Sequence, residues 1–136
     1  MTTELKHKKI LVIEEVEDDS LLRNALSAKL VLEGFGVLAA SNGEEGLATA
    51  LQEHPDLILV DIVLPGMDGI TMMKKLRDSG EWGKNVPIIL LTNLSADDQR
   101  INQAIVDNEP AYYMMKSNSK ISDLISKIKE RLSCQY

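Results

Sequence analysis

Short apolar runs alternate along this chain with longer segments in which apolar residues recur at helical spacing. The apolar runs cover residues 10–13, 37–40, 57–60, 86–91 and 111–115. Such alternation is typical of βαβ units, in which each helix carries the chain back to begin a parallel strand. The third and fourth runs are continuously apolar, which indicates central strands covered by helices on both faces. The sequence therefore predicts an α/β fold with a doubly wound, five-stranded parallel sheet.

Five apolar stripes mark the helices between these runs. In the first stripe Leu22, Leu26 and Leu30 lie four residues apart, and the helix is predicted to end at Gly34, because glycine tolerates positive φ. The remaining stripes are Leu47 and Leu51; Ile70, Met73 and Leu76; Ile101, Ala104 and Ile105; and Ile121, Leu124, Ile125, Ile128 and Leu132. The last stripe spans three turns and is the clearest of the five.

Four methionines and the single tryptophan have expected positions of their own. Met72, Met73, Met114 and Met115 are expected to fill the core, since methionine adapts to irregular gaps. Trp82 lies in a polar segment before the fourth strand, where the sequence allows either a partner contact or an exposed loop residue.

Length and charge limit the classes of protein that this chain can belong to. A chain of 136 residues fits one domain, predicted over residues 9–133 with short tails at 1–8 and 134–136. A net charge of −6 argues against a broad nucleic-acid-binding surface. Cys134 is the single cysteine, so no internal disulfide is expected. No signal peptide or membrane-spanning run is evident, and a cytoplasmic protein is predicted.

Polar residues follow four of the predicted strands, at the edge where ligands bind in doubly wound sheets. They are Glu14, Glu15, Glu17, Asp18 and Asp19 after the first strand, Asp61 after the third, Thr92 after the fourth and Lys116 after the fifth. Carboxylates that face one another repel unless a cation neutralises them, and an all-oxygen set favours Mg²⁺ or Mn²⁺. With the metal bound, one carboxylate could attack a phosphoryl donor while the hydroxyl and the ammonium stabilise the transferred group.

The segment from Leu57 to Gly69 resembles the acceptor strand and loop of CheY-like response-regulator receiver domains. Pro65 and Gly69 stand at the matching offsets from Asp61, and the resemblance extends over most of the chain. It implies a flavodoxin-like (βα)5 three-layer sandwich with strand order 2-1-3-4-5. It also implies that Asp61 accepts a phosphoryl group from a sensor histidine kinase or a phosphotransfer protein.

The same resemblance implies roles for four further residues. Val63 would offer its backbone carbonyl to Mg²⁺, and Lys116 would bind the phosphate. Thr92 would be the switch hydroxyl that moves toward the phosphate. Tyr113 would be the aromatic side chain that rotates inward, although an aromatic residue in a strand is also commonly plain core.

Two alignments compete for the acidic pair of the metal site. Counting forward from the first strand selects Glu14 and Glu15, which puts Glu14 beside Asp61. Counting backward from the first helix selects Glu17 and Asp18, the favoured pair, because a Glu-Asp pair before the helix is the commoner arrangement in the family. About three extra residues in this loop cause the ambiguity.

The chain departs from the family pattern beside the surface that is expected to rearrange. Ser117 replaces the usual proline after Lys116, so no cis peptide bond is expected there. Glu109 and Pro110 replace small residues before the fifth strand, and Asn93 follows Thr92 where a smaller residue is usual. These changes bear on coupling and on phosphate lifetime more than on the phosphoryl chemistry.

The expected function is that of a single-domain response regulator in a phosphorelay. It is expected to be a switch with Mg²⁺-dependent self-phosphorylation and dephosphorylation, not an enzyme acting on other substrates. Its output would pass to an unknown downstream protein, through the surface formed by the last two helices and the fifth strand. The alternative is a degenerate receiver that serves as a phosphorylation-independent docking module. Oligomeric state is left open.

Overall fold

The computed structural model describes residues 8–14, 25–92, 99–109, 111–115 and 121–133. A helix over residues 25–32 precedes the second strand. The other elements are β1 (Lys9–Ile13), β2 (Gly36–Ala40), α2 (Gly43–Glu53), β3 (Leu57–Asp61), α3 (Gly69–Arg77), α4 (Glu81–Asn85), β4 (Ile88–Thr92), α5 (Gln99–Asp107), β5 (Ala111–Met115) and α6 (Ile121–Ser133).

The five strands form one parallel sheet in the order β2-β1-β3-β4-β5, which confirms the predicted topology. The strands begin and end within two residues of the predicted runs. The largest difference is at β4, which begins at Ile88 and not at residue 86. Val86 instead closes the short helix α4, because its backbone N–H donates to the Trp82 carbonyl.

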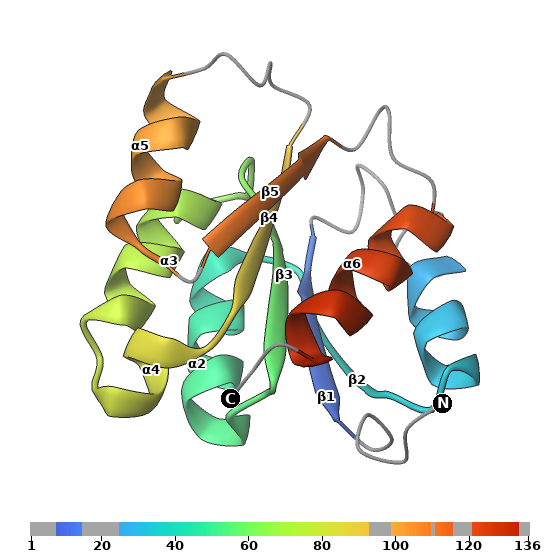
Figure 1. Ribbon diagram of the computed structural model, residues 1–136. Helices are drawn as coiled ribbons and strands as arrows, with labels where there is room; N and C mark the ends of the chain where they lie inside the picture. Colours follow the sequence, from blue (N-terminus) through green and yellow to red (C-terminus); the bar gives the residue numbers. More distant parts are fainter. Residues whose placement is uncertain (1–7, 15–24, 93–98, 110, 116–120, 134–136) are drawn as a thin grey trace.

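Helices cover both faces of the sheet and enclose two apolar clusters (Figure 1). The helix over residues 25–32 and α6 lie on one face, with a cluster that includes Leu26, Leu30, Ile125 and Ile128. Helices α2, α3 and α5 lie on the other, with a cluster that includes Met72, Met73 and Leu76. Within the described ranges, no helix is both long and apolar enough to span a bilayer.

Local signals set the ends of the helices on both faces. Gly34 has a φ of 98° and ends the turn after the helix over residues 25–32, as the sequence predicts. Asn42 caps α2 by accepting a hydrogen bond from the Glu45 N–H at 2.8 Å. The Glu45 carboxylate accepts in return from the Ser41 N–H at 2.8 Å. The first of these bonds satisfies an amide group that the helix itself leaves unpaired, and the second holds the residue that precedes the cap.

The predicted stripe of α2 is only partly correct, because Leu51 is 43% exposed. Ala50 is fully buried in its place, and Leu47 is half-buried. The reason is the close approach of α2 to the sheet: a Cβ atom at Gly46 would lie 2.5 Å from the Ile13 Cδ1 atom. The small residues of α2 therefore face the sheet, and the larger Leu51 turns outward.

Trp82 does not lie in an exposed loop, which removes one of the two possibilities that the sequence left open. It lies in α4, is half-buried and packs against the cluster beneath α2 and α3. Its ring stacks on that of His54, with centroids 4.2 Å apart and planes 5° apart. Met72 and Met73 are fully buried, as predicted, and Met114 packs against the cluster on the opposite face.

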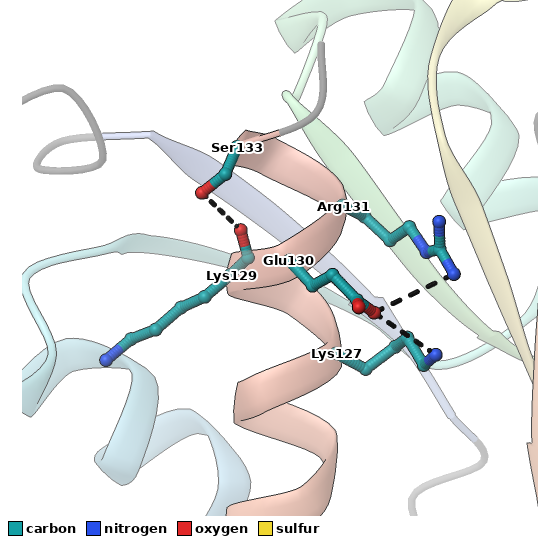
Figure 2. A network of polar contacts seen from close by, with 5 residues as sticks. All are labelled: Lys127, Lys129, Glu130, Arg131 and Ser133. Atoms are coloured by element: carbon teal, nitrogen blue, oxygen red, sulfur yellow. Dashed lines mark hydrogen bonds and ion pairs between the residues drawn. The ribbon is translucent and has the colours of Figure 1, made fainter.

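Ionic contacts join α6 to the helix over residues 25–32. Glu130 pairs with Lys127 and Arg131 on one side of α6, while the Lys129 side chain extends the other way (Figure 2). Lys129 forms an ion pair with Glu33, just beyond the end of the neighbouring helix. The hydrogen bond and the charge of Lys129 hold the pKa of Glu33 below its ordinary value.

We predict that Glu33→Gln lowers the free energy of unfolding at neutral pH by a small amount, and that the difference from wild type narrows under acid. A carboxylate whose folded pKa is depressed stabilises the protein above its ordinary pKa, and this contribution is lost as the pH falls through the folded value. Urea unfolding at several pH values measures it. Glu109→Gln, which removes an exposed charge elsewhere, is the control. If the difference in free energy of unfolding between Glu33→Gln and wild type stayed the same at the lowest pH, the stabilising role of the Glu33 carboxylate would be contradicted.

Candidate functional site

The carboxyl ends of the strands bring three of the predicted site residues to one edge of the sheet. Ile13 is opposite Val60 in the β1–β3 register, so Glu14 and Asp61 follow one residue further along neighbouring strands. Asp61 pairs with Leu91, and Thr92 comes next on β4. The edge therefore gathers a glutamate, an aspartate and a threonine, as parallel strand ends in a doubly wound sheet should.

Asp61 closes the central strand β3 and is 4% exposed. Its Oδ1 atom accepts a hydrogen bond from the Val63 N–H at 3.1 Å, which orients the carboxylate at the start of the following loop. The Ile62 N–H donates to the Leu91 carbonyl at 3.0 Å, so the sheet pairing continues past the aspartate. The carboxylate is thus held on a strand end and not on a loose loop.

The loop that follows Asp61 returns to the same point at the start of α3. The Gly69 N–H donates to the Ile62 carbonyl at 2.8 Å, and Asp68 caps α3 by accepting from the Thr71 N–H at 2.7 Å. Gly66 has a φ of 74°, a left-handed conformation that glycine adopts without strain. The Val63 side chain is 64% exposed at this rim.

Two glycines allow the backbone to pass within contact distance of this loop. A Cβ atom at Gly69 would lie 2.3 Å from the Asp61 carbonyl oxygen and 3.0 Å from the Ile62 Cα atom. A Cβ atom at Gly43, the first residue of α2, would lie 2.3 Å from the Met67 carbonyl oxygen. Sequence reasoning noted Gly69 only for its offset from Asp61 and missed Gly43, for which the cap residue Asn42 was the available signal.

Glu14 is fully buried and continues the β1 strand by one residue. Its backbone N–H donates to the Ala40 carbonyl at 3.1 Å, which holds the residue against β2. Burying two carboxyl groups at adjoining strand ends is costly unless their charges are compensated. The oxygen donors of Glu14 and Asp61, with the Val63 carbonyl nearby in sequence, suit a hard divalent cation such as Mg²⁺.

Several predicted site residues lie outside the described residues. These are Glu15, Glu17, Asp18 and Lys116, together with Asn93, Pro110 and Ser117. Across the part of the chain that the structure describes, no group of three His, Cys, Asp or Glu residues forms a metal cluster. The preference for Glu17 and Asp18 over Glu14 and Glu15 therefore stays a prediction.

The two predicted switch residues occupy neighbouring strands. Thr92 is the last residue of β4 and pairs with Met115. Tyr113 pairs with Leu90, is half-buried and packs against the cluster beneath α3 and α5. Tyr112 and Met114 pack on the opposite face, where the Arg131 guanidinium lies 3.9 Å from the Tyr112 ring centre. The position of Tyr113 fits both a switch role and plain packing.

The chain is an α/β domain with a doubly wound parallel sheet, and a buried acid ends its central strand. In such domains the functional site lies at the carboxyl ends of the strands. Residues 11–129 match the model of the response regulator receiver domain. The chain belongs to this family, so it is a receiver domain of a response regulator in two-component signalling.

Known proteins resemble this chain in sequence and in structure. The response regulator PleD of Caulobacter vibrioides is 39% identical over 93 residues, which cover 68% of this chain and 20% of PleD. A two-component response regulator from Clostridium difficile matches with a TM-score of 0.80 and 28% identity, over 94% of this chain and 98% of that one. The matched region makes up 20% of PleD and 38% of the transcriptional regulator ycf27 of Porphyridium aerugineum, so this chain spans well under half of these relatives.

One structural neighbour contains a metal. The receiver domain of sensor histidine kinase PA1611 from Pseudomonas aeruginosa shares the fold, with a TM-score of 0.77 and 24% identity over 93% of this chain and 98% of that one. A magnesium ion is coordinated in the active-site cleft of that protein.

We predict that Gly69→Ala destabilises the protein by about 1–3 kcal/mol, because the new methyl group meets backbone atoms that cannot rotate away. Urea unfolding measures this change. Gly36→Ala is the matched control, since a Cβ atom there has its nearest contact at 3.7 Å. If the two variants were equally stable, the close contact between the start of α3 and the Asp61 backbone would be contradicted.

Proposed function

We propose that Asp61 accepts a phosphoryl group from a sensor histidine kinase or a phosphotransfer protein. The observation that carries this proposal is the position of Asp61, buried at the end of β3 and held by the Val63 N–H. A carboxylate oxygen forms the new bond to phosphorus as the bond from phosphorus to the donor imidazole nitrogen breaks. The electron pair of the broken bond stays on the imidazole nitrogen, which takes up a proton, so the donor histidine is left as neutral imidazole.

We further propose that Mg²⁺ binds at this edge, held by Asp61, the Val63 carbonyl and at least one acid that follows β1. Mg²⁺ supplies charge neutralisation at the phosphoryl oxygens and between the carboxylates. The magnesium in the cleft of the PA1611 receiver domain, which shares this fold, supports the proposal. Glu14 is the acid best supported among the described residues, because the register places it beside Asp61 and its side chain is fully buried.

The remaining roles follow from the family and extend this proposal. Thr92 serves as the switch hydroxyl, Lys116 binds the phosphate and Tyr113 rotates as the site changes. The phosphorylated surface around α5, β5 and α6 is then recognised by a downstream protein. The domain acts as a switch with self-phosphorylation and dephosphorylation chemistry, and not as an enzyme on other substrates.

Two expectations from sequence stay predictions. One is that the domain works as a single-domain regulator, since its curated relatives carry the same region within longer chains. The other is a cytoplasmic location.

Intact mass spectrometry after incubation with Mg²⁺ and acetyl phosphate tests the acceptor. We predict one labile phosphoryl adduct on the wild-type protein and none on Asp61→Asn, because the amide lacks the nucleophilic carboxylate oxygen. Urea unfolding of the variant verifies that it is folded. If the wild-type protein formed no adduct under conditions that modify another receiver domain, the phosphorylation-independent docking module would be the better interpretation.

A comparison of single substitutions decides which acids bind the metal. We predict that Glu14→Gln weakens Mg²⁺ binding roughly tenfold or more, as measured by titration calorimetry, because it removes a buried carboxylate beside Asp61. Glu44→Gln, an exposed charge near the loop at Gly66, is the matched control and should change affinity little. Glu17→Gln and Asp18→Asn are measured alongside. Wild-type affinity in Glu14→Gln, with loss in the other two, would assign the site to Glu17 and Asp18.

A further inference from the structure

A buried arginine forms hydrogen bonds that link three helices at the end of the molecule opposite Asp61. Arg77 is the last residue of α3 and is 8% exposed. Its Nε atom donates to the Asn108 carbonyl at 2.8 Å, and its Nη1 atom donates to the Gly83 carbonyl at 2.7 Å. One guanidinium thus joins the ends of α3 and α5 to the middle of α4.

The contact with Asn108 secures the C-terminal end of α5. Asn108 is 7% exposed, and its Nδ2 atom donates to the Ala104 carbonyl at 2.8 Å. The final carbonyls of a helix lack partners within the helix, so these two bonds satisfy groups that would otherwise be buried unpaired. Burial lowers the pKa of Arg77 to about 10, so the guanidinium stays charged at neutral pH and faces the negative end of the α5 dipole.

The backbone around the Arg77 guanidinium is closely packed. A Cβ atom at Gly83 would lie 2.2 Å from the Leu76 carbonyl oxygen, so α4 packs directly on the last turn of α3. The Ser79 hydroxyl donates to the same carbonyl at 2.6 Å. The carbonyls that accept from Arg77 are therefore presented by backbone that is itself closely packed.

The rest of α5 is held by a narrow apolar face. Ile101 and Ala104 are its buried residues, Ile105 is half-buried and Val106 is 65% exposed. The N-terminal end of α5 follows β4 and so lies on the side of Thr92, whereas the C-terminal end leads to the start of β5. One end of α5 thus lies on the side where β4 ends, and the other lies beside the start of β5 (Figure 1).

We infer that Arg77 is a positioning residue that fixes the C-terminal end of α5, so that a change at the phosphorylation site displaces the helix at its N-terminal end. The inference rests on the proposed function for its trigger. The anchoring itself is a property of the unmodified protein. Arg77 touches none of the reacting groups and acts through the Asn108 carbonyl.

Hydrogen exchange of the full chain, with and without Mg²⁺ and beryllium fluoride as a phosphoryl mimic, tests this assignment. In wild type the mimic should change exchange over residues 99–104 and leave 105–109 equally protected. In unmodified Arg77→Met, exchange over 105–109 should be roughly ten- to a hundredfold faster, because the bonds from a charged donor are lost. With the mimic, the change should then extend over the whole of α5.

Two further variants separate anchoring from general stability. Arg77→Lys keeps the charge but cannot reproduce the fixed geometry of two donors, so its exchange over 105–109 should be intermediate. Lys75→Met removes an exposed charge from the same helix and should match wild type. The anchoring would be overturned if Arg77→Met matched Lys75→Met, or if it raised exchange equally in all five strands. If the mimic altered nothing in wild type, the trigger would fail, while exchange in the unmodified variants would still decide the anchoring.

Discussion

The parallel pairing of β1 with β3 is the constraint on which the site depends. Ile13 lies opposite Val60, and this register carries Glu14 and Asp61 to the same edge one residue later. Both strands are buried between two layers of helices, so a slip of one residue would turn apolar side chains from one cluster into the other. The core therefore determines the register that brings the two carboxylates together, and the carboxylates themselves need not stabilise that register.

Close backbone contacts make the loop that follows Asp61 an extension of the sheet. Gly69 and Gly43 let the starts of α3 and α2 approach the loop on two sides, and the Ile62 N–H continues the pairing with β4. A loop enclosed in this way keeps the Asp61 carboxylate oriented before any ligand arrives, and such preorganisation is what the proposed phosphoryl transfer to Asp61 requires.

The apolar pattern predicted the five-stranded parallel sheet, because burial on both faces leaves a strong signal in the sequence. The strand order came from the resemblance to receiver domains, and the rule for doubly wound sheets indicated the edge at which Glu14, Asp61 and Thr92 meet. Prediction from the sequence failed where packing depended on distances between elements. Leu51 has the right spacing for the core, but the close approach of α2 at Gly46 buries Ala50 instead. Trp82 was placed in a polar segment, and nothing local in the sequence indicates that His54 would stack on it. The acidic pair stayed open for a related reason, since spacing alone cannot choose between a strand count and a helix count.

Trp82, which stacks on His54, is an intrinsic fluorescent probe. The chain contains one tryptophan, so its tryptophan fluorescence, excited apart from that of the three tyrosines, originates entirely at the junction of α2 and α4. That junction adjoins the Gly83 carbonyl bound by Arg77 and lies at the far end of the sheet from Asp61. Tryptophan emission from this protein therefore reports on the end of the molecule that Arg77 holds in place, and not on the edge of the sheet that carries Asp61.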